Sequence, residues 1–159
     1  MTVDRGTGRQ VDGKEGDHAP PVPLSACPPV LLYDGTCGFC ATSVQWVLKR
    51  DRVGTLCFAA LQGETARPIL ARHPELAGVD SVVWVEGGGE LVRVRSAAAI
   101  AVGRYLEGPW SVAARLAALI PGPIRDWGYD LIARHRHKLT RNGPECLLPT
   151  PGERARFLP

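Results

Sequence analysis

Leu32-Tyr33-Asp34-Gly35-Thr36-Cys37-Gly38-Phe39-Cys40 joins an apolar run to a helical pattern, and the other elements of the chain can be placed around it. The run begins at Val30 and is typical of a short buried strand. Asp34-Gly35 is a turn signal, and from Cys40 onward apolar residues recur at helical spacing. The order strand, turn, Cys-x-x-Cys and helix therefore places two thiols at a helix N-terminus, where unpaired N–H groups stabilise a thiolate.

The composition fits a globular protein of one domain. The chain has 159 residues, 45% of them hydrophobic, which is enough for a real core. Its net charge of +3 is too small to indicate nucleic acid. Residues 1–26 lack the apolar run of a signal peptide, and no run reaches the ~18 apolar residues of a membrane span. We therefore expect a cytoplasmic protein with no membrane span and no nucleic-acid partner.

The predicted elements follow the order of a known fold. Residues 1–29, rich in glycine, proline and charge, are predicted to be a disordered tail before one domain over residues 30–159. Strands are predicted at 30–33, 56–59, 81–85 and 91–95, and helices from 40, over 62–73, over 97–106, from 109 and from 123. Glycines 87–89 signal a hairpin between the last two strands, and residues 146–159 an extended tail. This is a thioredoxin-like layout: an α/β fold with a mixed sheet (βαβ then ββα) and a helical C-terminal extension.

Cys37 and Cys40 have the spacing of a redox-active dithiol. Disulfide exchange needs one accessible, partly ionised thiol and a second thiol that can resolve the mixed disulfide. We expect Cys37, at the helix end, to be the nucleophile. Cys40, one turn further and more buried, is expected to be the resolving thiol. This exchange requires neither an organic cofactor nor a metal.

Asp34 lies at the strand end, close to the dithiol, and two interpretations of it stay open. It can form the turn by accepting hydrogen bonds from the backbone amides that follow it. It can instead take and return protons during the exchange. Its charge would disfavour a thiolate on Cys37, whereas the helix end would favour one.

The pattern Asp34-x-x-Cys37-x-x-Cys40 after an apolar strand resembles the DCC family of thiol-disulfide oxidoreductase-like proteins. Further segments that resemble the family are Phe58-Ala59-Ala60-Leu61-Gln62, Arg95-Ser96-x-Ala98, Tyr129-Asp130-Leu131-Ile132-Ala133-Arg134-x-Arg136 and Cys146-x-x-Pro149. The resemblance covers the chain from about Val30 to its end, and implies a thioredoxin-like fold and a disulfide oxidoreductase activity. The expected partners are an unknown disulfide-containing protein or small-molecule thiol, and a thiol reductant.

One feature of thioredoxins is missing. Thioredoxins place a cis-proline just before the third strand, facing the Cys-x-x-Cys, whereas Ala77-Gly78-Val79-Asp80-Ser81 contains no proline. Two alternatives to a redox enzyme also stay open. The first is a structural zinc module in which Cys37 and Cys40 are completed by Cys57, Cys146 or a histidine. The second is a non-enzymatic interaction domain on the same scaffold.

The remaining candidate residues receive structural interpretations. Cys57 is expected to be a core thiol, and Cys27 to be incidental. Cys146 packs under the tail or serves as a third redox thiol. Ser96 is expected to cap a helix whose amides could also face a ligand. The four tryptophans are expected in or beside the core, and the basic run 134–138 on a solvated helix face.

Overall fold

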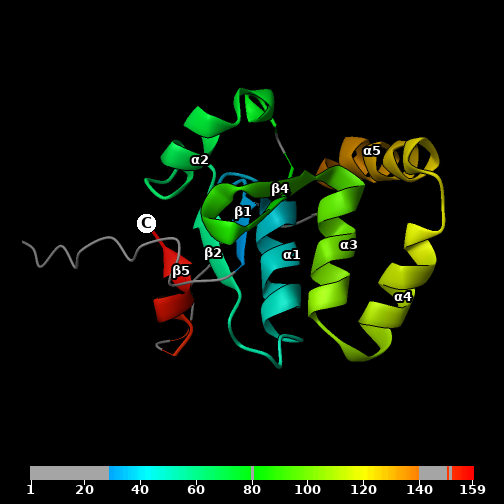
Figure 1. The fold of residues 1–159 in the computed structure, drawn as a ribbon, viewed down its shortest axis with the longest axis horizontal. Helices are drawn as coiled ribbons and strands as arrows, with labels where there is room; N and C mark the ends of the chain where they lie inside the picture. Colours follow the sequence, from blue (N-terminus) through cyan, green and yellow to red (C-terminus); the bar gives the residue numbers. More distant parts are fainter. Residues whose placement is uncertain (1–28, 80, 140–149, 151) are drawn as a thin grey trace, which may run out of the picture.

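The centre of the molecule is a mixed sheet (Figure 1). The computed structural model describes residues 29–79, 81–139, 150 and 152–159. In these residues the sheet has five strands in the order β4-β3-β1-β2-β5. The strands are β1 (Val30–Tyr33), β2 (Cys57–Ala60), β3 (Val83–Glu86), β4 (Leu91–Val94) and β5 (Phe157–Leu158). β1 runs parallel to β2 and antiparallel to β3, β3 and β4 form the predicted hairpin, and β2 runs parallel to β5.

Successive side chains along each strand point to opposite faces of the sheet, which creates two cores, one on each face. Leu31 pairs in register with Phe58 on one side and Trp84 on the other, and all three side chains are buried. They pack with apolar side chains of α1 and α3. The neighbouring positions, among them Leu32 and Ala59, point to the opposite face and pack with α2.

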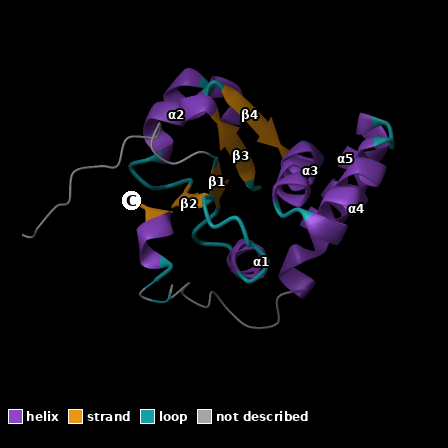
Figure 2. Cartoon of the chain, turned by 60° about the horizontal axis from the view of Figure 1, so that its bottom comes forward, coloured by secondary structure: helices purple, strands orange, loops and turns teal. Residues whose placement is uncertain are grey.

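Five helices surround the sheet in the described part of the chain (Figure 2). They are α1 (Gly38–Leu48), α2 (Ala66–Arg72), α3 (Arg95–Tyr105), α4 (Gly108–Ala118) and α5 (Gly122–Leu139). α4 and α5 contact α3 and lie outside the two layers that flank the sheet. Gly103 lets α3 and α4 approach closely, because a Cβ at this position would meet the Cβ of Ala114 at 2.8 Å.

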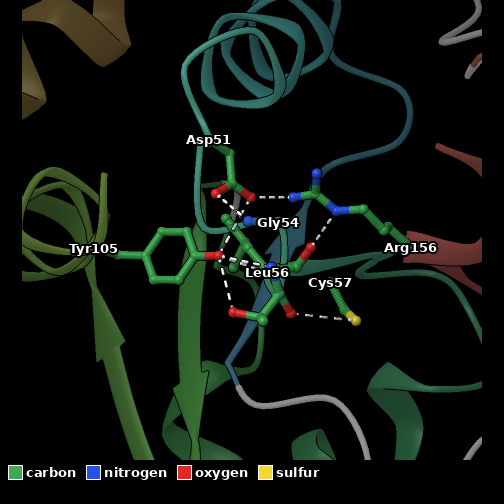
Figure 3. Close-up of polar contacts among 7 residues, drawn as sticks. Asp51, Gly54, Leu56, Cys57, Tyr105 and Arg156 are labelled. Atoms are coloured by element: carbon green, nitrogen blue, oxygen red, sulfur yellow. Dashed lines mark hydrogen bonds and ion pairs between the residues drawn. The ribbon is translucent and has the colours of Figure 1, made fainter. Parts of the chain in front are cut away.

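The C-terminal segment is fixed to the body by a buried polar cluster (Figure 3). Arg156 forms an ion pair with Asp51, whose side chain is fully buried, and its Nε donates to the Leu56 carbonyl at 2.9 Å. The Tyr105 hydroxyl accepts hydrogen bonds from the N–H groups of Thr55 at 3.0 Å and Leu56 at 2.8 Å. It also donates to Asp51 at 3.3 Å. The cluster therefore joins the end of α1, the entry to β2, α3 and the C-terminal segment.

The predicted α/β fold is confirmed, with three corrections. The C-terminal segment is not simply an extended tail, because Phe157–Leu158 adds a fifth strand to the sheet. α2 starts at Ala66, later than predicted. Trp84 is buried as expected, but Trp127 is 67% exposed and belongs to no core.

Several other expectations lie wholly or partly outside the described residues. These are the tail over residues 1–28, Cys27, Cys146 and the side chains of the basic run from residue 136 onward. Within the described residues, no helix is long and apolar enough to cross a membrane.

Candidate active site

The two cysteines occupy different environments at the start of α1. Cys37 is the N-cap residue, with an extended backbone (φ −97°, ψ 111°), and its side chain makes no capping hydrogen bond. Cys37 is half-buried, whereas Cys40, in the first helical turn, is buried at 3% exposure. Both are free thiols. The accessible first thiol and the buried second thiol match the expected arrangement.

The turn before α1 is built on the Asp34 carboxylate. Its Oδ1 accepts hydrogen bonds from the Thr36 N–H at 2.9 Å, the Thr36 hydroxyl at 2.7 Å and the Gln62 amide at 3.0 Å. Gln62 in turn accepts a hydrogen bond from the Gly35 N–H at 3.2 Å. The structure therefore shows the turn-forming role of Asp34. Gln62, whose only sequence signal was its place in a motif, is a second support of this turn.

The pKa of the Cys40 thiol is raised from 9.0 to about 12, chiefly by burial. The neighbouring Cys37 contributes to this rise, both by charge and by a hydrogen bond. The backbone of Asp34 donates a hydrogen bond that lowers this pKa, while the Asp34 charge raises it. Cys40 is therefore protonated at neutral pH. Asp34 therefore influences the pKa of Cys40, and its carbonyl also accepts a hydrogen bond from the Cys37 N–H at 3.2 Å.

An apolar pocket of about 600 Å³ begins beside the dithiol. Phe39 and Cys40 form part of its wall, and Ser81 and Val82, just before β3, form another part. The remaining lining comes mainly from α1, α3, α4 and α5. No single segment of the sequence signalled this pocket, because its walls are contributed by helices far apart in the chain.

The residues between β4 and α3 connect this region to α5. Ser96 does not cap α3: the N-cap residue is Val94, and the buried Ser96 hydroxyl donates a short hydrogen bond to Asp126 on α5. Arg95 has a positive φ of +52°. Its guanidinium Nη1 lies 3.9 Å from the carboxylate Oδ2 of Asp130, which is also on α5. The Arg95-Ser96 and Tyr129-Asp130 segments thus meet in space. Asp126 was missed, because nothing in the sequence marked it as the partner of Ser96.

Cys57 does not join the dithiol. It faces the α2 side of the sheet, whereas Cys40 lies on α1, against the opposite face. Cys57 is disulfide-bonded, so the expectation of a free core thiol is wrong, although its burial is confirmed. Across the described ranges, no group of three or more His, Cys, Asp or Glu side chains could hold a metal ion.

The chain is similar in sequence to known proteins. The chain is 41% identical over 131 residues to the uncharacterized protein YuxK of Bacillus subtilis (strain 168), covering 82% of this chain and 93% of that protein. It is 29% identical over 121 residues to a chloroplastic DCC family protein of Arabidopsis thaliana, covering 76% of this chain and 69% of that protein. No solved structure matches the chain. Residues 31–142 match the DCC1-like thiol-disulfide oxidoreductase family, and the chain therefore belongs to that family.

Proposed function

We propose that the protein is a thiol-disulfide oxidoreductase that works through Cys37 and Cys40. The observation that carries the proposal is the contrast between the two thiols. Cys37 is accessible at a helix N-terminus, and Cys40 is buried one turn away with a pKa of about 12. Membership of the family supports a redox role. The contrast supports separate roles for the two thiols, attack on the substrate by Cys37 and resolution of the mixed disulfide by Cys40.

In the proposed reaction, the Cys37 thiolate attacks one sulfur of a substrate disulfide. A mixed disulfide forms, and the other half of the substrate leaves as a thiol. Cys40 then loses its proton and attacks the Cys37 sulfur. This step releases the second substrate thiol and leaves a Cys37–Cys40 disulfide. A dithiol reductant returns both electrons, and the cytoplasm is the location that we propose for this cycle.

Asp34 is the proposed acceptor of the Cys40 proton. Besides Cys37, its carboxylate is the charged group that raises the pKa of Cys40, and its position is fixed by the turn. A base is needed at this point, because a thiol with a pKa of about 12 is otherwise almost never ionised at neutral pH.

The first prediction tests the order of attack. Cys40→Ser should accumulate a mixed disulfide on Cys37 when the reduced protein meets a disulfide substrate, because no resolving thiol remains. Intact-mass spectrometry under non-reducing conditions measures the adduct. Cys37→Ser is the matched control and should accumulate none on Cys40, whose thiol is buried and protonated.

Equal trapping by the two variants would show that either thiol attacks and would refute the assignment. No trapping by either, together with stoichiometric zinc in the purified wild type, would replace the redox proposal by the zinc module. If neither variant traps a mixed disulfide and the wild type contains no metal, the remaining alternative is a non-enzymatic interaction domain.

A further inference from the structure

The pocket beside Cys40 has mainly apolar walls. Among the described residues that line it, none carries a charge. Small side chains create the space, in particular Ala99, Gly103, Ala113, Ala117 and Ala133. Its volume of about 600 Å³ lies in the range of cavities that bind drug-sized molecules.

Aromatic rings form part of the pocket wall. Trp46 on α1 and Trp110 on α4 meet edge to face, with ring centroids 4.7 Å apart. Both rings belong to the lining, together with Phe39 beside the dithiol. Aromatic walls of this kind favour aliphatic or aromatic occupants. The guanidinium of Arg50 lies over both indole rings, 4.1 Å from the Trp46 centroid and 5.4 Å from the Trp110 centroid, so a cation of the chain itself already lies against them.

Four lining residues carry a hydroxyl group, Thr42, Ser43, Ser81 and Tyr129, and two of these hydroxyls donate their proton within α1. Thr42 donates its proton to the Gly38 carbonyl at 2.9 Å, and Ser43 donates to the Phe39 carbonyl at 2.9 Å. A peptide in the pocket would bring a main-chain N–H and C=O with every residue, and these would lose water without gaining enough partners. A charged thiol compound would lose its hydration in the same way.

We propose that the pocket binds the apolar part of a small-molecule disulfide whose substituent is uncharged and lipophilic, and so selects the substrate of the dithiol. This inference rests on the function proposed above. The substituent lies against Phe39 and Cys40, which brings its disulfide to the start of α1, where Cys37 attacks. In the reaction, one substrate disulfide gives two thiols, the Cys37–Cys40 pair is oxidised, and a dithiol reductant restores it.

The experiment compares two substrates and one unreactive ligand on the full chain. Diphenethyl disulfide is the lipophilic substrate and hydroxyethyl disulfide the polar one. Diphenethyl sulfide lacks the S–S bond, so it reports binding alone, through the fluorescence of Trp46 and Trp110. We expect kcat/KM for the lipophilic disulfide to exceed that for the polar one by at least tenfold, and the sulfide to bind.

Variants on α4 locate the effect. Ala117→Phe fills the pocket and should lower the ratio of the two kcat/KM values at least tenfold and abolish sulfide binding. Ala113→Phe, at an exposed position of the lining, does the same if the first variant fails to fold. Leu116→Phe is the matched control: Leu116 is 62% exposed and lies outside the lining, so this variant should behave as the wild type.

The outcomes separate the two proposals. Turnover without substrate preference, and no sulfide binding, would overturn the pocket assignment and leave the oxidoreductase function intact. Sulfide binding that Ala117→Phe abolishes, without turnover of any disulfide, would leave the pocket and overturn the function. A disulfide-bonded peptide is assayed beside the two small substrates, and a preference for it over both would overturn the small-molecule assignment. Size-exclusion chromatography gives the oligomeric state, and a dimer that Ala117→Phe dissociates would also overturn the assignment, since a second copy would then fill the pocket.

Discussion

At the scale of single residues, Asp34 combines two roles that one substitution can separate. Its Oδ1 holds the turn through bonds from Thr36 and Gln62, and its charge acts on Cys40. Asp34→Asn keeps an acceptor oxygen for the turn but removes the base. We expect the free energy of unfolding to change by less than about 1 kcal/mol, and resolution of the mixed disulfide at neutral pH to slow about 10- to 100-fold. Rapid-quench measurement of the mixed disulfide gives this rate.

The pH profile makes the Asp34 test decisive. The Asp34 charge raises the pKa of Cys40, so the asparagine variant also ionises Cys40 more easily. Its resolution rate should therefore climb with pH and approach that of the wild type in alkaline solution. Asp34→Ala is the control for the turn and should lower the free energy of unfolding by about 2 kcal/mol, because three donors lose their acceptor. If Asp34→Asn resolved the mixed disulfide at the wild-type rate at neutral pH, with the wild-type dependence on pH, Asp34 would have only the turn-forming role.

Single residues were predictable where the controlling interactions are local. The spacing of Cys37 and Cys40 after a strand and a turn was enough to place one thiol at the helix end and the other inside it. Ser96 shows the limit. A serine before an alanine-rich helix indicates a cap, but its hydroxyl bonds to Asp126, thirty positions along the chain.

Among the elements, β5 is the one that the sequence did not reveal. A strand of two residues, Phe157–Leu158, is too short to show alternation. It forms because Phe157 stacks on Phe58, with centroids 5.3 Å apart, and because Arg156 reaches the buried Asp51. The longer strands and α1 were predicted, because the pattern of apolar residues that indicates each of them lies within the element itself.

The attachment of β5 should therefore depend on one ion pair. Arg156→Met keeps most of the side-chain volume but leaves Asp51 buried without its cationic partner. We expect the free energy of unfolding to fall by about 3 kcal/mol, because a buried carboxylate without a positive partner is costly even where Tyr105 and the Gly54 N–H still donate to it. Urea denaturation measures the loss, and hydrogen exchange at β5 and the facing edge of β2 localises it. Arg154→Met, two residues earlier and exposed, is the matched control and should change stability by less than about 0.5 kcal/mol.

At the scale of the whole molecule, the layered sheet was predictable and the placement of α4 and α5 was not. Their apolar residues indicated helices, yet Leu119 and Trp127 are mostly exposed, at 79% and 67%. Contact with α3 depends instead on the absence of a side chain at Gly103 and on the Ser96–Asp126 bond. The pocket beside the dithiol follows from this packing, so it was no more predictable than the packing itself.

Stability of the whole molecule should depend on the protonation of Cys40. The folded chain holds the Cys40 proton more tightly than the unfolded chain, because its pKa rises from 9.0 to about 12 on burial. Below about pH 9 both states are protonated and the contribution is fully present. As the pH rises further, only the unfolded thiol ionises, and stability is lost by up to about 1.4 kcal/mol per pH unit.

The comparison of wild type with Cys40→Ala isolates this contribution, since the two chains share every other titrating group. We expect the difference in their free energies of unfolding to change by about 1.4 kcal/mol between about pH 8 and about pH 10, with the wild type losing more. Urea denaturation of the reduced proteins at each pH measures it. Oxidised wild type should follow the alanine variant, because a disulfide sulfur does not titrate. A difference that stays constant with pH would mean that the Cys40 pKa is not raised, and the distinction between an ionised attacking thiol and a protonated resolving thiol would lose its physical basis.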